Sequence, residues 1–231
     1  MTKNTTRKNR YDILLCDADD TVLDFQTAMR TASIAAARDV GITAADETVI
    51  DKFKAVSSIV WRMLEDKSLL REQLDTKRFA MLKEALNEDF DTAAITEAFR
   101  RELKKTRFLI DGATDFLSTV RNRGIEVYII TNGFAPIAHE RLKALDGYVD
   151  GVFISDEVGY HKPDPMFFEH VLNAIGVVDK SRILVFGDGV NSDIAGGINS
   201  GLDTCLFDPT GAKTCDCDYR VSSYAQALDI L

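Results

Sequence analysis

The residues in this sequence that are best suited to catalysis or ligand binding are three aspartates that follow short apolar stretches. Asp17 comes directly after residues 13–16, Asp19 stands two positions further on, and Asp188 comes just after residues 183–186. If both stretches are parallel strands of one sheet, ligands bind at their carboxyl ends and the three carboxylates gather there. Carboxylates that lie this close cannot all stay ionised without compensation. A hard divalent cation is the usual compensation, and an all-oxygen ligand set suits Mg²⁺.

Other residues near the predicted strand ends suit a phosphoryl group. Thr131 offers a hydroxyl after the apolar residues 125–130, and Asn132 and Gly133 offer backbone amides. Lys162 adds a positive charge. A divalent cation, a lysine, a hydroxyl and exposed amides together describe a pocket for a phosphoryl group.

The elements that must position these residues are five short apolar stretches, which we expect to be strands. They are continuously apolar rather than alternating, which is typical of parallel strands covered on both faces. Helical patterns that end near glycines lie between most of them. This alternation predicts an open, doubly wound, Rossmann-like α/β sheet. The expected strands are 13–16, 125–130, 152–154, 183–186 and 204–207, and the expected helices are 115–123, 165–174 and 193–199.

The long interval between the first two expected strands is far longer than the dozen or so residues that a crossover needs. Its apolar residues follow helical spacing almost throughout, and only one glycine and no proline fall between Asp24 and Phe108. We therefore expect a helical domain inserted at residues 23–108, and an α/β core domain made of residues 1–22 and 109–231.

Composition excludes several classes of protein. The 231 residues are 45% hydrophobic and 28% charged, which is ordinary for a globular protein, and the net charge is −9. A binder of nucleic acid polymers would carry the opposite sign, whereas a small anionic substrate remains compatible if a metal or a lysine reverses the local field. No apolar stretch approaches the roughly 18 residues of a membrane span, so no membrane partner is expected.

The cysteines and the first ten residues bear on location. Cys16 and Cys205 lie inside apolar stretches, while Cys215 and Cys217 stand one residue apart without a nearby histidine, which favours neither a disulfide framework nor a zinc site. The first ten residues are polar and basic, unlike a secretory signal. The expected location is the cytoplasm.

Four motifs in order carry a resemblance to a known family. The sequence resembles the haloacid dehalogenase (HAD) superfamily, and the helical insertion resembles its class with an alpha-helical cap. The motifs are Asp17-Ala18-Asp19-Asp20-Thr21, Thr131-Asn132-Gly133, Lys162-Pro163, and Gly187-Asp188 followed by Asp193.

This resemblance implies a role for each residue. Asp17 would be the nucleophile that forms an aspartyl-phosphate, and Asp19 the general acid and base. Thr131, Asn132 and Lys162 would bind the phosphoryl group. Mg²⁺ would be held by Asp17, by the backbone carbonyl of Asp19 and by Asp188, and Asp193 would orient Lys162 or a metal-bound water unless it is simply an aspartate at a helix N-terminus.

Within the superfamily, the sequence is similar to the pyrimidine 5′-nucleotidases that act on non-canonical nucleotides. Residues 130–134 and 156–159 carry this likeness, and Trp61 and Arg78 of the insertion fit as substrate contacts. Trp61 could instead be part of the core of the cap, as is commoner for a lone tryptophan on a helical stripe. The resemblance implies a Mg²⁺-dependent phosphatase, with a small phosphorylated substrate, such as a nucleotide, as its partner.

Two alternatives stay open at this point. One is a HAD phosphatase for sugar phosphates or other small metabolites. The other is a phospho-acceptor signalling module, which also phosphorylates an aspartate on an α/β sheet but has no need of the inserted helices or of the acid Asp19. The sequence does not indicate an oligomeric state.

Overall fold

The computed structural model describes residues 9–65, 68–176 and 179–231. These residues divide into two compact units, one made of the chain up to Asp24 together with Leu109–Leu231, and the other of Phe25–Phe108. Among the described residues, no helix is both long and apolar enough to span a membrane.

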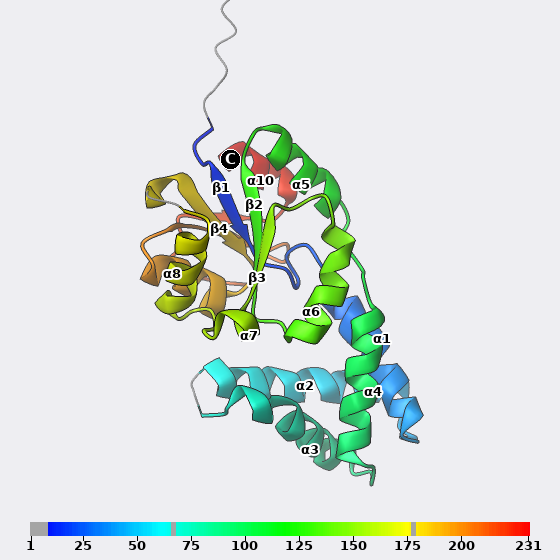
Figure 1. Ribbon diagram of the computed structural model, residues 1–231. Coiled ribbons are helices and arrows are strands. Elements are labelled where there is room, and N and C mark those ends of the chain that lie inside the picture. Colours follow the sequence, from blue (N-terminus) through cyan, green and yellow to red (C-terminus); the bar gives the residue numbers. More distant parts are fainter. Residues whose placement is uncertain (1–8, 66–67, 177–178) are drawn as a thin grey trace, which may run out of the picture. The chain divides into compact units, whose positions relative to one another are not determined.

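The first unit is built around a parallel sheet of six strands in the order β3-β2-β1-β4-β5-β6, drawn in Figure 1. Every neighbouring pair of strands is parallel. This order, with helices between the strands, is the doubly wound α/β fold that the sequence predicts. The strands are β1 (Ile13–Cys16), β2 (Glu126–Thr131), β3 (Gly151–Ile154), β4 (Ile183–Gly187), β5 (Asp203–Phe207) and β6 (Tyr219–Val221).

The register of the central strands brings their carboxyl ends together. Cys16, the last residue of β1, pairs with Ile129 of β2 on one side and with Phe186 of β4 on the other. The residues that follow β1, β2 and β4 therefore emerge at the same edge of the sheet, where open α/β sheets bind their ligands.

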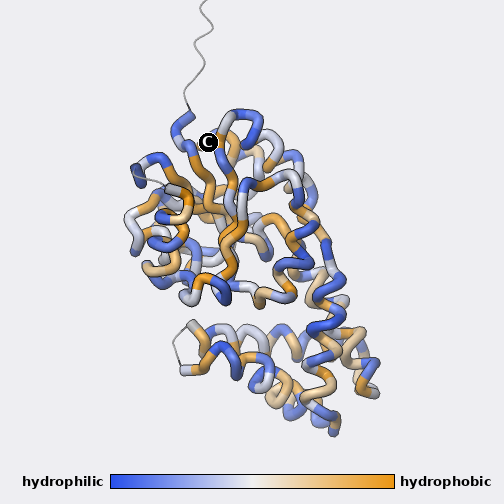
Figure 2. The backbone as a smooth tube through the Cα atoms, viewed as in Figure 1, coloured by the Kyte–Doolittle hydropathy of each residue, from blue (hydrophilic) through white to orange (hydrophobic). Residues whose placement is uncertain are grey.

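Helices cover both faces of the sheet. Alternate side chains of each strand point to opposite faces, so each strand contributes to both layers of the core. Leu14 and Cys16 pack in a core with Phe116 of one helix, whereas Ile13 and Leu15 pack with Phe167 of another. Figure 2 shows the apolar strands at the centre of this unit. Its helices are α5 (Ala113–Asn122), α6 (Ala135–Leu142), α7 (Ser155–Val158), α8 (Pro165–Ala174), α9 (Ala195–Asn199) and α10 (Tyr224–Ile230), with short 3-10 turns at Lys143–Leu145 and Lys180–Arg182.

Some elements differ from the sequence prediction, which does not include helices α6, α7 and α10. A π-helical turn, Val190–Ile194, precedes α9, so the expected helix over 193–199 is ordinary α-helix only in its second part. The edge strand β6 was not predicted, because its three residues include an exposed arginine and are too few to show a pattern. None of these differences moves a strand end.

The second unit is helical. Helix α1 packs on α4, and α2 packs on α3. Phe53, Phe79 and Phe99 meet at its centre, with ring centroids 4.9–5.9 Å apart. The helices are α1 (Phe25–Asp39), α2 (Asp46–Glu65), α3 (Leu74–Leu86) and α4 (Thr92–Lys105), with a 3-10 turn at Arg71–Gln73 before α3.

The cysteines differ in their pairing. Cys16 and Cys205 are free thiols buried in the core of the sheet, as their apolar surroundings indicate. Cys215 and Cys217, whose spacing does not predict a disulfide framework, are joined by a disulfide in the loop between β5 and β6. Spacing alone did not reveal the bond, because the loop conformation decides whether two cysteines one residue apart can meet.

Candidate active site

Asp17 lies at the end of β1 and is held by the neighbouring strand end. Its backbone N–H donates to the carbonyl of Phe186, at 2.8 Å. The hydroxyl of Thr21 donates to Oδ2 of Asp17, at 3.3 Å, and accepts the backbone N–H of Asp188, at 3.1 Å. Thr21, the last residue of the first motif, thus joins the loop after β1 to the loop after β4.

Lys162 is the positive charge at the centre of the site. Its Nζ lies 2.5 Å from Oδ1 of Asp17, 2.6 Å from Oδ1 of Asp193 and 2.7 Å from the carbonyl oxygen of Ile130. Its side chain is only 2% exposed. Burial alone would lower the pKa of Lys162, but the charges of Asp17 and Asp193 raise it above its usual value. Lys162 is therefore a permanent cation.

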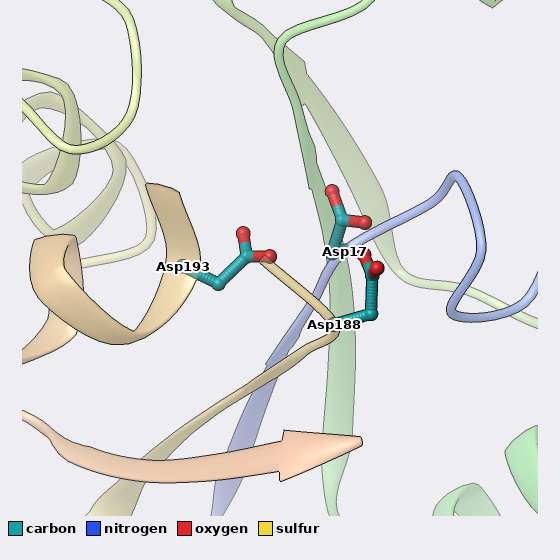
Figure 3. A group of neighbouring side chains, drawn as sticks. All are labelled: Asp17, Asp188 and Asp193. Carbon is teal, nitrogen blue, oxygen red and sulfur yellow. The ribbon is translucent and has the colours of Figure 1, made fainter. Parts of the chain in front are cut away.

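Three carboxylates lie close together at this edge of the sheet, and Figure 3 shows them as Asp17, Asp188 and Asp193. One oxygen each from Asp17, Asp188 and Asp193 lies within 4.8 Å of the other two. Burial and the charge of Asp17 raise the pKa of Asp188 and of Asp193 above the ordinary value. The site is therefore short of positive charge even with Lys162 in place.

The close approach of Asp193 to the end of β4 depends on a glycine. A Cβ atom on Gly187 would lie 2.4 Å from Oδ2 of Asp193, which is closer than atoms can pack. The same carboxylate oxygen accepts the backbone N–H of Gly189, at 3.0 Å. Gly187 lets Asp193 reach both Lys162 and this loop.

Thr131 and Asn132 lie at the end of β2, beside Lys162. The side-chain amide of Asn132 donates to the carbonyl of Lys162, at 2.8 Å, and accepts its backbone N–H, at 2.9 Å. The buried hydroxyl of Thr131 accepts the backbone N–H of Gly133, at 3.0 Å. The Asn132 side chain thus fixes the Lys162 loop, which leaves the hydroxyl of Thr131 as the group suited to an anion.

Asp19 is paired with an arginine and is not among the three clustered carboxylates. Its Oδ1 accepts a hydrogen bond from Nη1 of Arg141, at 2.6 Å, and its side chain is 32% exposed. Partial burial raises the pKa of Asp19, although the charge of Arg141 opposes this rise. The carboxylate of Asp19 thus has a cationic partner of its own, Arg141, beside the cluster of Asp17, Asp188 and Asp193.

Two cationic residues of the site had no signal in the sequence. Arg141 looks like an ordinary basic residue near the end of a helix, and Lys213 lies in a loop. Lys213 Nζ is 2.6 Å from Oδ2 of Asp188, and its backbone N–H donates to Oδ2 of the buried Asp208, at 2.9 Å. The positive charge of Lys213 thus lies beside Asp188 at the carboxyl edge of the sheet, although Lys213 belongs to none of the four motifs.

The two residues singled out in the insertion lie in different surroundings. Arg78 is 6% exposed, forms an ion pair with Asp75 at 3.0 Å, and its guanidinium lies over the rings of Phe53 and Phe99. This placement favours a role inside the helical unit. Trp61 is half-buried and packs against the apolar cluster of Val56, Val60, Leu69 and Leu74 in the same unit, and the guanidinium of Arg71 lies 5.2 Å from its ring centroid.

A buried lysine between two aspartates, at the carboxyl edge of a doubly wound sheet, is the arrangement that the motifs imply. The sequence model of the haloacid dehalogenase-like hydrolases matches residues 11–201. The chain belongs to this family. Membership makes it a HAD hydrolase, and the matched residues include every candidate site residue named above except Lys213 and Asp208.

Relatives of this HAD hydrolase include two named nucleotidases. Pyrimidine 5′-nucleotidase PynA of Streptococcus pneumoniae is 30% identical over 226 residues, which cover 96% of this chain and 95% of that protein. Pyrimidine 5′-nucleotidase YjjG of Escherichia coli is 33% identical over 198 residues, which cover 85% of each. The crystal structure of the HAD-hydrolase YfnB of Bacillus subtilis, bound to magnesium, has a TM-score of 0.90 at 30% identity and covers 96% of this chain and 99% of that one.

Proposed function

We propose that this HAD hydrolase is a Mg²⁺-dependent phosphatase that cleaves phosphomonoesters through an aspartyl-phosphate on Asp17. The observation that carries the proposal is the pairing of Asp17 with the buried ammonium of Lys162, at 2.5 Å. The ammonium of Lys162 holds the carboxylate of Asp17 in place and offsets negative charge where an anionic phosphoryl group would approach this nucleophile.

The acidic cluster fits a magnesium ion by the chemistry of its donors. Its ligand atoms are all carboxylate oxygens, which Mg²⁺ prefers. We assign the metal to Asp17 and Asp188, with the backbone carbonyl of Asp19 as the third ligand, because this is the ligand set that the family resemblance implies. The bound ion would supply positive charge for the phosphoryl oxygens and reduce the repulsion between the carboxylates.

The chain's own residues account for the other parts of the reaction. A carboxylate oxygen of Asp17 attacks phosphorus while the ester P–O bond breaks, and Asp19 gives a proton to the departing oxygen. Lys162 holds positive charge beside Asp17, and Thr131 donates its hydroxyl to a phosphoryl oxygen. Asp19 then takes a proton from the water that attacks phosphorus, and the bond between phosphorus and Asp17 breaks to release inorganic phosphate.

We assign pyrimidine nucleoside monophosphates as the substrate class. This assignment is supported by the two nucleotidase relatives, which match most of the chain, including its helical insertion. The helical unit, residues 25–108, is the proposed cap that selects the leaving group, because a phosphate site alone cannot distinguish one phosphomonoester from another. Trp61 is its candidate for contact with the base, since Arg78 is buried within the unit.

A screen of phosphate release tests the proposal. Purified protein with Mg²⁺ is offered pyrimidine and purine nucleoside monophosphates, sugar phosphates and an aryl phosphate, with Asp17→Asn as the control. We expect kcat/KM for the best pyrimidine nucleotide to exceed that for any sugar phosphate by about tenfold or more. A sugar phosphate as the best substrate would overturn the nucleotidase assignment, and turnover by Asp17→Asn above about 1% of wild type would overturn the nucleophile.

A further inference from the structure

Arg141 lies on the face of α6 that is buried in the core. Its neighbours on that face are apolar, and its own side chain is only 4% exposed. Asp19, the ion-pair partner of its Nη1, lies 122 positions earlier in the sequence. The tertiary fold therefore brings a buried guanidinium to one particular carboxylate of the site.

Packing alone does not explain an arginine at this position. Removing a guanidinium from water is unfavourable, and well-packed apolar residues often replace a buried ion pair without loss of stability. The rest of the inward face of α6, Ile137, Ala138 and Leu142, is apolar, so a large apolar residue would suit the core here. What an apolar residue cannot do is bind a carboxylate oxygen in a fixed direction.

The contact distinguishes the two oxygens of Asp19. Arg141 can only donate hydrogen bonds, so Oδ1 of Asp19, at 2.6 Å, must act as an acceptor. Within the described ranges, Oδ2 of Asp19 receives no hydrogen bond, and the side chain is 32% exposed. The contact with Arg141 therefore leaves Oδ2 as the oxygen of Asp19 that can meet an atom of the substrate.

We propose that Arg141 is a positioning residue for proton transfer, which binds Oδ1 of Asp19 and thereby presents Oδ2 to the leaving group. The inference rests on the proposed function, in which Asp19 is the general acid and base. In the first step, Oδ2–H gives its proton to the ester oxygen as the P–O bond breaks and the bond between phosphorus and Asp17 forms. In the second step, Oδ2 takes the proton of the attacking water as the bond between phosphorus and Asp17 breaks.

The test uses leaving groups that differ in their need for a proton. Dinitrophenyl phosphate releases a stable anion, whereas an alkyl phosphate requires protonation of its departing oxygen. We expect Arg141→Met to lower kcat/KM by about tenfold or more for the alkyl phosphate and by less than about twofold for dinitrophenyl phosphate. Arg141→Lys, which keeps a cationic donor, should recover part of the loss. A uniform loss over the series would overturn the inference.

A matched control comes from the opposite edge of the sheet. Arg182 forms an ion pair with Asp12 at 2.6 Å, just before β4 and β1 begin. Arg182→Met therefore removes an arginine–aspartate pair at the other end of these strands, although a more exposed one, and we expect it to show no dependence on the leaving group. If Arg141→Met does not fold, Arg141→Gln, which keeps a neutral hydrogen-bond donor, should show a smaller loss that is still selective for the alkyl phosphate. An Arg141→Gln variant without this selectivity would equally overturn the inference.

The variant Asp19→Asn separates this inference from the proposed function. Asp19→Asn should lower kcat/KM for the alkyl phosphate selectively. Adding Arg141→Met to Asp19→Asn should lower this kcat/KM by less than about twofold further, because both changes impair the same proton transfer. If Asp19→Asn shows no selectivity, the acid assignment fails. If Asp19→Asn is selective and Arg141→Met is not, only the role of Arg141 fails.

Discussion

Lys213 and Asp188 are joined by two hydrogen bonds from a single ammonium group. Nζ of Lys213 lies 2.6 Å from Oδ2 of Asp188 and 2.7 Å from its carbonyl oxygen. This side chain therefore places a positive charge directly on the carboxylate that we assign to Mg²⁺. A metal ion at Asp188 must bind against that charge, although the half-exposed position of Lys213 leaves it partly screened by solvent.

Removing this charge should strengthen the binding of magnesium. Mg²⁺ raises Tm, and we compare the Mg²⁺ concentration that gives half of this rise. We expect that concentration to be about threefold lower for Lys213→Met than for wild type, because the charge of Lys213 no longer repels the ion. Lys180→Met is the control, because Lys180 donates to the carbonyl of Ser200 and is not part of the site. A weaker metal response in Lys213→Met would instead mean that Lys213 holds Asp188 in its binding orientation.

Chelation should stop turnover, and Mg²⁺ should restore it. Without a divalent cation, the charges of Asp17 and Asp188 repel each other and the incoming phosphate. Phosphate release is measured before EDTA treatment, after it, and after Mg²⁺ is added back. Beryllium fluoride with Mg²⁺ should raise Tm in wild type and not in Asp17→Asn, since it mimics a phosphoryl group on Asp17. Turnover that survives exhaustive EDTA treatment contradicts the metal assignment.

Lys162 should be essential for stability as well as for activity. Lys162→Met leaves Asp17 and Asp193 buried without their shared cation, so we expect the free energy of unfolding in urea to fall by about 3–5 kcal/mol. Adding Asp193→Asn removes one of the unpaired charges and should recover part of that loss. If the double variant is no more stable than Lys162→Met, the repulsion between Asp17 and Asp193 is not the cause of the lost stability.

Replacement of Arg78 by alanine and of Trp61 by alanine should have different effects on stability and activity. Arg78→Ala removes a buried ion pair with Asp75, so it should lower Tm and reduce activity toward nucleotides and aryl phosphates alike. Trp61→Ala should lower kcat/KM for the best nucleotide by about tenfold, or about 1.4 kcal/mol, with little effect on an aryl phosphate. Equal losses on both substrates in Trp61→Ala would assign Trp61 to the core of the helical unit.

The sequence by itself determined the fold class and the residues of the motifs. Continuous apolar stretches predicted five of the six strands, because a parallel strand buried on both faces leaves a strong local pattern. Since each strand end is followed by polar residues, Asp17, Thr131 and Asp188 could be placed at one edge without coordinates. The short edge strand β6 and the π-helical turn before α9 left no such pattern.

Which charged side chains pair depends on the packing of elements that are distant in the chain. Arg141 and Lys213 reach Asp19 and Asp188 from segments far away in the chain, and neither lies in a motif. Arg78 became a buried partner of Asp75, although its position in the sequence also suited a contact with substrate. A local pattern records whether a side chain is buried, because periodicity follows from the geometry of one helix or strand. It does not record which distant charge the fold brings to that side chain, since that depends on how the elements pack.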